Sequence, residues 1–335
     1  MNIKSLLIGS AAAFAAVSGA QAADAIVAAE PEPMEYVRVC DAFGTGFFYI
    51  PGTETCLKIG GYVRFQADFG EKAFGQSDWE AWSRARLEIQ AKSDTELGTL
   101  TSFTALQIEA GNNSVTSGAS GAAYIDEAYI ELGGFRIGTF LNWWDSDMAG
   151  ETEVASTTTR FTSARYVYDG GTFLAGLSLD EIPDSWGTTL HNDFGVSGMV
   201  KATLGGVTFE LLGAYDDAAE EGAVRAWLTA DVGPGKFELM GLYASGFNNY
   251  YDAAEWSVAV DYSFAATEKL SITPGFQYLS DTNLDLPGKP DQWRVGVTFD
   301  YQVVDNLKVK ATVNYRDDDL RGDAVTGFLR LDRSF

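Results

Sequence analysis

The chain is poor in the residues that bind metals and nucleic acids. Its 335 residues include one histidine and two cysteines, which supply too few soft ligands for a zinc site. Lysine and arginine number 23 against 47 aspartates and glutamates, giving a formal charge of −24. Binding to the phosphate backbone of nucleic acid is driven by basic residues that release its counterions. The composition therefore predicts no nucleic-acid partner, no metal and no cofactor.

Long apolar runs are missing beyond the start of the chain. Lys4, the apolar stretch 6–17 and the small-residue site Ala20-Gln21-Ala22 predict a cleaved secretory signal peptide over residues 1–22. Every later apolar run is far shorter than the roughly 18 residues that a membrane-spanning helix needs. Any insertion into a membrane must therefore be by strands.

The two cysteines predict a disulfide. Export would place Cys40 and Cys56 in an oxidising compartment, where an even pair of cysteines normally closes a bridge. We expect residues 23–56 to form a periplasmic leader and a disulfide lobe. The remaining residues, 57–335, are predicted to form one array of strands.

What the chain has in abundance is a two-residue alternation of apolar and polar side chains. From Leu307 to Arg316 every second residue is apolar and those between are polar or charged, as in a strand with lipid on one face and water on the other. Comparable segments predict 16 strands: 57–68, 79–92, 100–110, 124–132, 135–140, 160–168, 173–180, 193–203, 207–216, 224–231, 237–244, 255–263, 270–279, 292–301, 307–316 and 324–335.

The connections between these segments alternate between short and long. Short ones such as Gly133-Gly134 and Gly233-Pro234-Gly235 carry turn residues and are expected at the periplasmic side. The longer ones are expected to face outward. The predicted fold is all-β: a 16-stranded antiparallel transmembrane β-barrel with short periplasmic turns, longer external loops and an inward-folded third loop.

A soluble β-sandwich would also show alternation, but the aromatic residues favour the barrel. Those on the apolar parity fall at both strand ends, which matches the two aromatic girdles of a membrane barrel. Next to long loops lie Tyr215, Tyr243, Trp256, Tyr278, Trp293 and Tyr315, and next to short turns or the terminus lie Tyr262, Tyr301 and Phe335. A closed barrel of this width is expected to enclose a water-filled lumen.

Charged residues on the inward parity suggest how solutes would be sorted. A basic wall is predicted where the first strands meet the last, and an acidic group in the third loop, residues 141–159. If this loop folds inward, its carboxylates face the basic wall across a constriction; the alternative is a solvated acidic surface loop. The basic wall comprises Arg64, Arg84, Arg86, Lys308, Lys310, Arg316 and Arg330, and the acidic loop comprises Asp145, Asp147, Glu151 and Glu153.

Three other functions compete with a diffusion channel that prefers cations. A substrate-specific channel for sugars or other nutrients would use exposed tryptophans as a sliding surface, with Trp82, Trp143, Trp144 and Trp227 as candidates. An outer-membrane enzyme would need His191, but its surroundings carry no positional signature of a catalytic triad. A structural or adhesive role through the external loops is disfavoured by their modest lengths. Separately, external acids such as Asp317-Asp318-Asp319 could bridge divalent cations to lipopolysaccharide.

Several motifs resemble a known family. These are VRVCDAFGTGFFYIPGTETCLKIGGYVR (residues 37–64), SDTELGTL (93–100), AYIELGGFRIG (128–138) and the terminal Arg333-Ser334-Phe335. They are similar to the alphaproteobacterial porins, which include the major outer-membrane porins of Brucella and the rhizobia. The resemblance implies a homotrimer in outer-membrane lipid and lipopolysaccharide that passively admits small hydrophilic solutes. It also implies that Phe335 belongs to the signal read by the barrel-assembly machinery.

Overall fold

The computed structural model describes residues 38–74, 77–111, 123–155, 158, 160–183, 192–284 and 287–335. The predicted signal peptide (1–22), most of the leader and His191 lie outside these ranges. Val39–Phe335 form one compact unit. The helices described within it are two 3-10 turns, Asp41–Phe43 and Trp143–Asp145; among the described residues no helix is long and apolar enough to cross a membrane.

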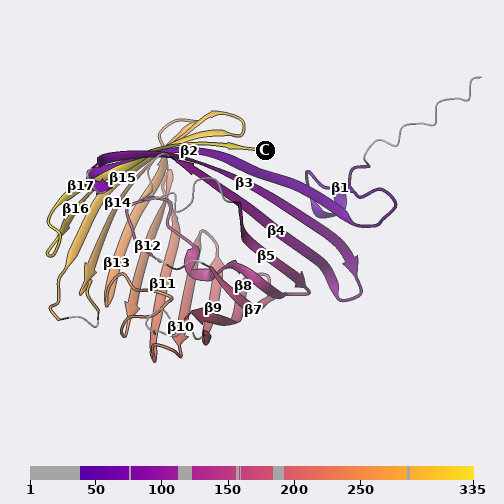
Figure 1. Ribbon diagram of the computed structural model, residues 1–335, viewed down its shortest axis with the longest axis horizontal. Helices are drawn as coiled ribbons and strands as arrows, with labels where there is room; N and C mark the ends of the chain where they lie inside the picture. The colour runs from indigo at the N-terminus through magenta and orange to yellow at the C-terminus, as the bar shows by residue number, and fades with distance from the viewer. Residues whose placement is uncertain are drawn as a thin grey trace, which may run out of the picture. The chain divides into compact units, whose positions relative to one another are not determined.

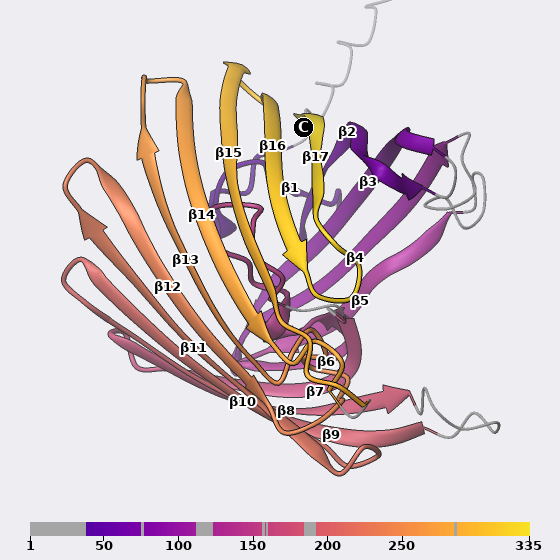
Figure 2. The same cartoon turned by 90° about the vertical axis from the view of Figure 1, so that its left-hand side faces the viewer.

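Sixteen strands close on themselves. Each pairs antiparallel with the next along the chain, and the last, β17, pairs with the first, β2 (Figures 1 and 2). The predicted closed barrel is therefore confirmed. The strands are β2 (Cys56–Phe74), β3 (Ser77–Thr95), β4 (Gly98–Gly111), β5 (Tyr124–Leu132), β6 (Phe135–Leu141), β7 (Arg160–Asp169), β8 (Phe173–Pro183), β9 (Asn192–Leu204), β10 (Val207–Asp216), β11 (Glu221–Val232), β12 (Gly235–Ala244), β13 (Trp256–Ala265), β14 (Leu270–Ser280), β15 (Gln292–Val304), β16 (Leu307–Asp318) and β17 (Ala324–Ser334).

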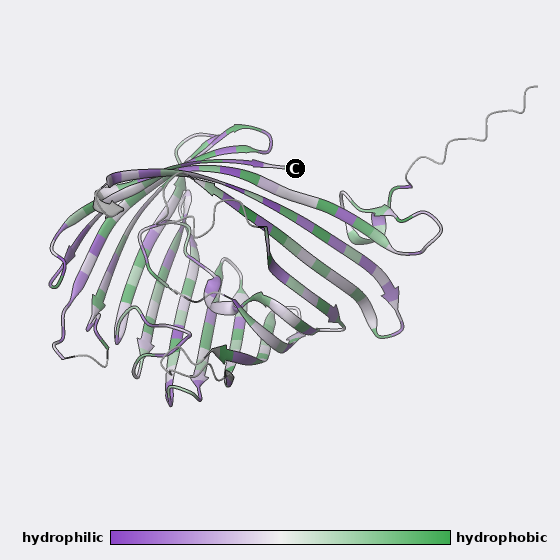
Figure 3. Cartoon of the chain, in the orientation of Figure 1, coloured by the Kyte–Doolittle hydropathy of each residue, from purple (hydrophilic) through white to green (hydrophobic). Residues whose placement is uncertain are grey.

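The outer face of the barrel is apolar. Figure 3 shows hydrophobic and hydrophilic residues alternating along the strands. Ile130 on β5 and Leu177 on β8 are 60% and 62% exposed, although a water-soluble domain would bury residues of this kind. Near the external ends, the rings of Trp256 and Tyr278 lie 5.3 Å apart, as do those of Trp293 and Tyr315. This surface suits lipid flanked by an aromatic girdle.

The first external connection differs from the prediction. Residues 69–78 were expected to form a loop, but β2 and β3 continue through most of them, and Phe69 pairs with Trp79 and Phe74 with Ser77. The reason is physical: a hairpin that rises beyond the lipid has water on both faces. Such a hairpin does not require alternating apolar and polar residues. The pattern that predicts the other strands is therefore missing there.

The predicted disulfide is present and belongs to a small lobe at the start of β2. Cys40 and Cys56 are bonded, with their Cα atoms 6.0 Å apart. The lobe adds a short strand, β1 (Phe48–Tyr49), that pairs with the first two residues of β2. β3 pairs along the other edge of β2, and on the edge that β1 occupies, β17 pairs with β2 only as far as Tyr62. The lobe thus covers part of a strand edge that would otherwise be open.

Candidate functional site

The inward face of the barrel is filled on one side. On β7–β14 most inward side chains are buried, for example Met240 and Arg225, both 0% exposed. They pack with the described part of the third loop (residues 142–155) and with residues 245–255 (the sixth loop) around one apolar cluster. The buried cluster comprises Trp144, Met148, Ala155, Phe161, Ile182, Met199, Leu212, Ala223, Met240, Leu242, Ala244, Tyr250, Tyr251 and Ala259.

Wall side chains hold the backbone of the third loop. The amide of Ala149 donates to Glu238 Oε2 on β12 at 2.7 Å, and the amide of Gly150 donates to Asp261 Oδ2 on β13 at 2.8 Å. The next amide, of Glu151, donates to Thr298 Oγ1 on β15 at 3.0 Å. These carboxylates and hydroxyls alternate with lipid-facing residues on their strands, so the described part of the loop lies along the inner wall.

Arg225 on β11 fixes the start of the same loop. Its guanidinium donates to three loop carbonyls, those of Trp143 (2.9 Å), Trp144 (3.2 Å) and Ser146 (3.0 Å). It also donates to Glu210 Oε1 at 3.0 Å. Arg225 is not among the residues of the predicted basic wall. No local sequence pattern marks it, because the carbonyls that it binds lie 79–82 residues earlier in the chain.

The four predicted acidic residues do not act alike. Glu151 Oε1 accepts from Lys310 Nζ at 2.8 Å and from Arg330 Nη1 at 3.4 Å. Glu153 instead accepts from the Met148 amide within the loop, at 2.8 Å. Burial raises the pKa of the Glu153 carboxyl to about 7, so this group is only partly ionised at neutral pH. Asp145 is half-buried and Asp147 is exposed.

The predicted basic wall also divides. Lys310 and Arg330 bind the third loop, whereas the others described here pair with carboxylates of the wall or remain exposed, as Lys308 does. Their distances are Arg64 Nε to Asp332 Oδ1 2.7 Å, Arg84 Nε to Glu109 Oε1 2.7 Å, Arg86 Nε to Glu88 Oε1 2.7 Å, Arg86 Nη2 to Glu127 Oε1 2.6 Å and Arg316 Nε to Asp318 Oδ2 4.0 Å; Arg86 also pairs with Asp126.

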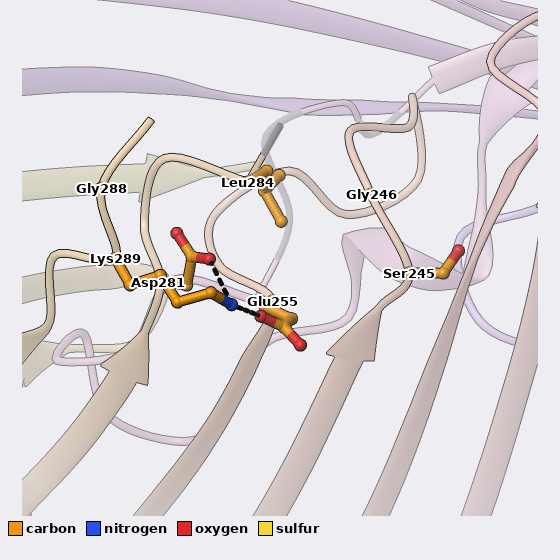
Figure 4. Close-up of a pocket in the computed structure, with 7 residues that line it drawn as sticks. All are labelled: Ser245, Gly246, Glu255, Asp281, Leu284, Gly288 and Lys289. Atoms are coloured by element: carbon orange, nitrogen blue, oxygen red, sulfur yellow. Dashed lines mark hydrogen bonds and ion pairs between the residues drawn. The ribbon is translucent and has the colours of Figure 1, made fainter. Parts of the chain in front are cut away.

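A separate polar pocket of about 470 Å³ lies at the external loops. Lys289 Nζ bridges Glu255 Oε2 at 3.0 Å and Asp281 Oδ2 at 3.2 Å (Figure 4). The pocket contains none of the predicted site residues. Its lining is Ser245, Gly246, Glu255, Asp281, Leu284, Gly288 and Lys289. Across the described ranges no group of histidine, cysteine, aspartate and glutamate could hold a metal ion.

Comparison with known proteins decides the family. The family described as "Porin subfamily" matches residues 24–327. This chain belongs to the porin family. The porin is 47% identical to outer membrane protein IIIA of Rhizobium leguminosarum bv. viciae, over 98% of this chain and 93% of that one. It is 36% identical to porin Omp2b of Brucella neotomae, over the full length of both.

Solved structures show the same fold at low sequence identity. The porin matches the outer-membrane channel DcaP of Acinetobacter baumannii with a TM-score of 0.65 and 18% identity, over 86% of this chain and 99% of that one. It matches the trimer form of OmpT of Vibrio cholerae with a TM-score of 0.59 and 10% identity, over 84% and 100%. Porins are non-enzymatic channels, so this porin is an outer-membrane channel, and the resemblance seen in its motifs is confirmed.

Proposed function

We propose that this porin is a general diffusion channel for ions and small hydrophilic solutes with a preference for cations. The observation that supports an aqueous path is the partial exposure of inward-facing charged side chains on β5, β6 and β15. On the unfilled side of the barrel the side chains of Asp300, Glu131 and Arg136 are 37%, 35% and 30% exposed. On the filled side Arg225 is fully buried. Water and solutes would therefore pass beside β15–β17 and β2–β6.

The third loop would narrow this path. Its acidic segment is held on the wall by Lys310 and Arg330, while Asp147 remains exposed. Because the remaining basic residues are largely neutralised by wall carboxylates, the wall opposite carries little net positive charge. Arg86, for example, touches Glu88, Asp126 and Glu127. Carboxylates that outnumber cations in a narrow pore favour the passage of cations.

A sugar-specific channel has less support. It needs exposed aromatic rings along the path, but Trp144 is 0% exposed. Trp143 is covered by the guanidinium of Arg165, which lies 4.0 Å from the ring centroid. Saturable block of conductance by a sugar would favour this alternative, whereas unchanged conductance across a sugar titration would favour free diffusion.

We also propose a homotrimer in outer-membrane lipid and lipopolysaccharide, assembled through a signal that includes Phe335. The trimer form of Vibrio cholerae OmpT supports the first part. The second is supported by the position of the terminal residue. Its backbone exchanges hydrogen bonds with Gly61 at 3.1 and 3.3 Å, while its side chain is 60% exposed. Such a ring is available for recognition rather than needed for packing.

Neutralising two acids of the third loop should weaken the cation preference. We expect Asp145→Asn combined with Asp147→Asn to move the reversal potential in a salt gradient toward zero, because two charges near the path are lost. Planar-bilayer recording measures this shift. The matched control is Asp317→Asn with Asp319→Asn at the external end of β16, which removes equal charge outside the pore and should change the potential little.

Two outcomes would contradict this account. A clear anion preference in the unmodified porin would exclude a cation-preferring channel. An unchanged reversal potential in the third-loop variant, with normal assembly, would place Asp145 and Asp147 outside the conducting path.

A further inference from the structure

The sixth loop folds into the barrel and presents two tyrosines to its interior. Tyr250 and Tyr251 are both 0% exposed. The side chain of Asn248, also 0% exposed, accepts from both of their amides at 3.0 Å and donates to the carbonyls of Gly246 and Tyr251 at 3.0 Å. Because a buried side chain satisfies its hydrogen bonds within the loop's own backbone, the loop has a defined shape. Its two tyrosines are therefore held in place.

These tyrosines pack against the third loop. The ring of Trp144 lies 6.3 Å from that of Tyr251, nearly parallel to it, and 6.4 Å from that of Tyr250. The guanidinium of Arg225 lies 5.5 Å from the Trp144 ring. Trp144 is thus enclosed between the sixth loop and the wall, with no exposed surface. Aromatic pairs at such distances add stability beyond the area that they bury.

A buried carboxylate anchors the sixth loop to the opposite part of the wall. The hydroxyl of Tyr250 donates to Asp180 Oδ2 on β8 at 2.8 Å. Asp180 is 1% exposed and also accepts from three serine hydroxyls, Ser163 and Ser178 at 2.6 Å and Ser197 at 2.9 Å. An ionised carboxylate at such a site requires donors, and the phenol supplies one of the four. This makes the contact directional as well as apolar.

A glycine on β9 leaves room for this contact. A Cβ placed at Gly195 would collide with the hydroxyl of Tyr250 and with Ile182. The backbone of Gly195 does not have positive φ, so its conformation does not require glycine. Glycine at this position is therefore explained by the space that Tyr250 needs.

We propose that the sixth loop is a clamp that fixes the third loop, with Tyr250 as the positioning residue that ties the clamp to β8. The third loop would then have two independent attachments. Arg225 and the wall carboxylates hold its backbone, and the two tyrosines hold Trp144. The consequence for the pore rests on the proposed function, in which the third loop narrows the conducting path. The clamp itself requires only that the two loops move together.

A spin label on the third loop tests the clamp directly. Ser146 is exposed, and the chain has no cysteine besides the disulfide pair, so Ser146→Cys in the full-length porin accepts a nitroxide at one place. We expect Tyr250→Ala to add a mobile component to its spectrum. Tyr278→Ala is the matched control, because the Tyr278 hydroxyl donates to Asp291 at 2.5 Å in the external girdle, away from the third loop, and should leave the spectrum unchanged.

Gly195→Ala provides a test that leaves both loops intact. It should displace Tyr250 and mobilise the label as Tyr250→Ala does. Gly213→Ala is its control, since a Cβ at Gly213 on β10 meets nothing within 4 Å. If Tyr250→Ala fails to assemble, as judged by heat-modifiable migration on gels, Tyr250→Phe keeps the ring and removes only the hydroxyl. It should mobilise the label to a smaller degree.

Conductance measured on the same variants separates this proposal from the proposed function. An immobile label in folded Tyr250→Ala and Gly195→Ala would overturn the clamp. A mobile label with higher and noisier single-channel conductance would support both the clamp and the narrowing role of the third loop. A mobile label with unchanged conductance would support the clamp and contradict the narrowing role.

Discussion

Arg225→Met is expected to destabilise the porin strongly and to make its conductance irregular. Methionine keeps most of the volume of the side chain but removes every donor. Three carbonyls of the third loop would lose their donor, and the buried carboxylate of Glu210 would lose Arg225 and keep Lys201, at 3.2 Å. Removing one member of a buried ion pair typically costs about 3–5 kcal/mol. Urea unfolding measured in detergent or lipid gives the loss of stability, and single-channel recording gives the fluctuation of the loop.

Two variants make this test specific. Arg225→Lys keeps the charge but has no forked set of donors, so it should fall between the parent and Arg225→Met. Arg321→Met removes an arginine from the exposed connection between β16 and β17 and should change neither quantity appreciably. Parent-like stability and parent-like current noise in Arg225→Met would show that Arg225 does not hold the third loop.

Leu239→Arg is expected to impair folding into lipid. Leu239 lies halfway along β12, is 40% exposed and alternates with the buried Glu238 and Met240, so its side chain faces the lipid near the middle of the membrane. Arginine at this depth costs about 2–4 kcal/mol in barrels of this type. The free energy of folding into vesicles, measured by urea titration, should fall by about this amount.

The matched control places the same change outside the lipid. Leu320 is 59% exposed in the connection between β16 and β17. Leu320→Arg should therefore alter the folding free energy by no more than about 0.5 kcal/mol. Equal losses in the two variants would mean that depth in the membrane is not what makes Leu239→Arg costly.

The strands could be predicted from the sequence because one rule governs them. Lipid on one side and water on the other impose a period of two on every spanning segment. This alternation can be recognised at 307–316 without knowing which strands lie beside it. The girdle is legible for the same reason. The rule ends where the lipid ends, which is why the tall β2–β3 hairpin was expected to be a loop.

The site could be predicted only in part, because its contacts join residues that are far apart in the chain. Parity places Arg86 on the inner face, but the register of three strands decides that Asp126 and Glu127 neutralise it. The pairing of Glu151 with Lys310 spans 159 residues. The inward fold of the sixth loop depends on Asp180, 70 residues before Tyr250. No local pattern encodes such pairs.

The short strand of the disulfide lobe bears on the order in which the barrel is made. Closure joins the two ends of the barrel sequence: Arg64 on β2 pairs with Asp332 on β17, 268 residues later. Loop-closure entropy makes so distant a pairing late and slow. Until β17 arrives, β2 has an unpaired edge, and such edges invite pairing with other chains. β1 is joined to β2 by a short turn and a local disulfide. It can therefore pair with the start of that edge before β17 does, and so protect it from pairing with other chains in the periplasm.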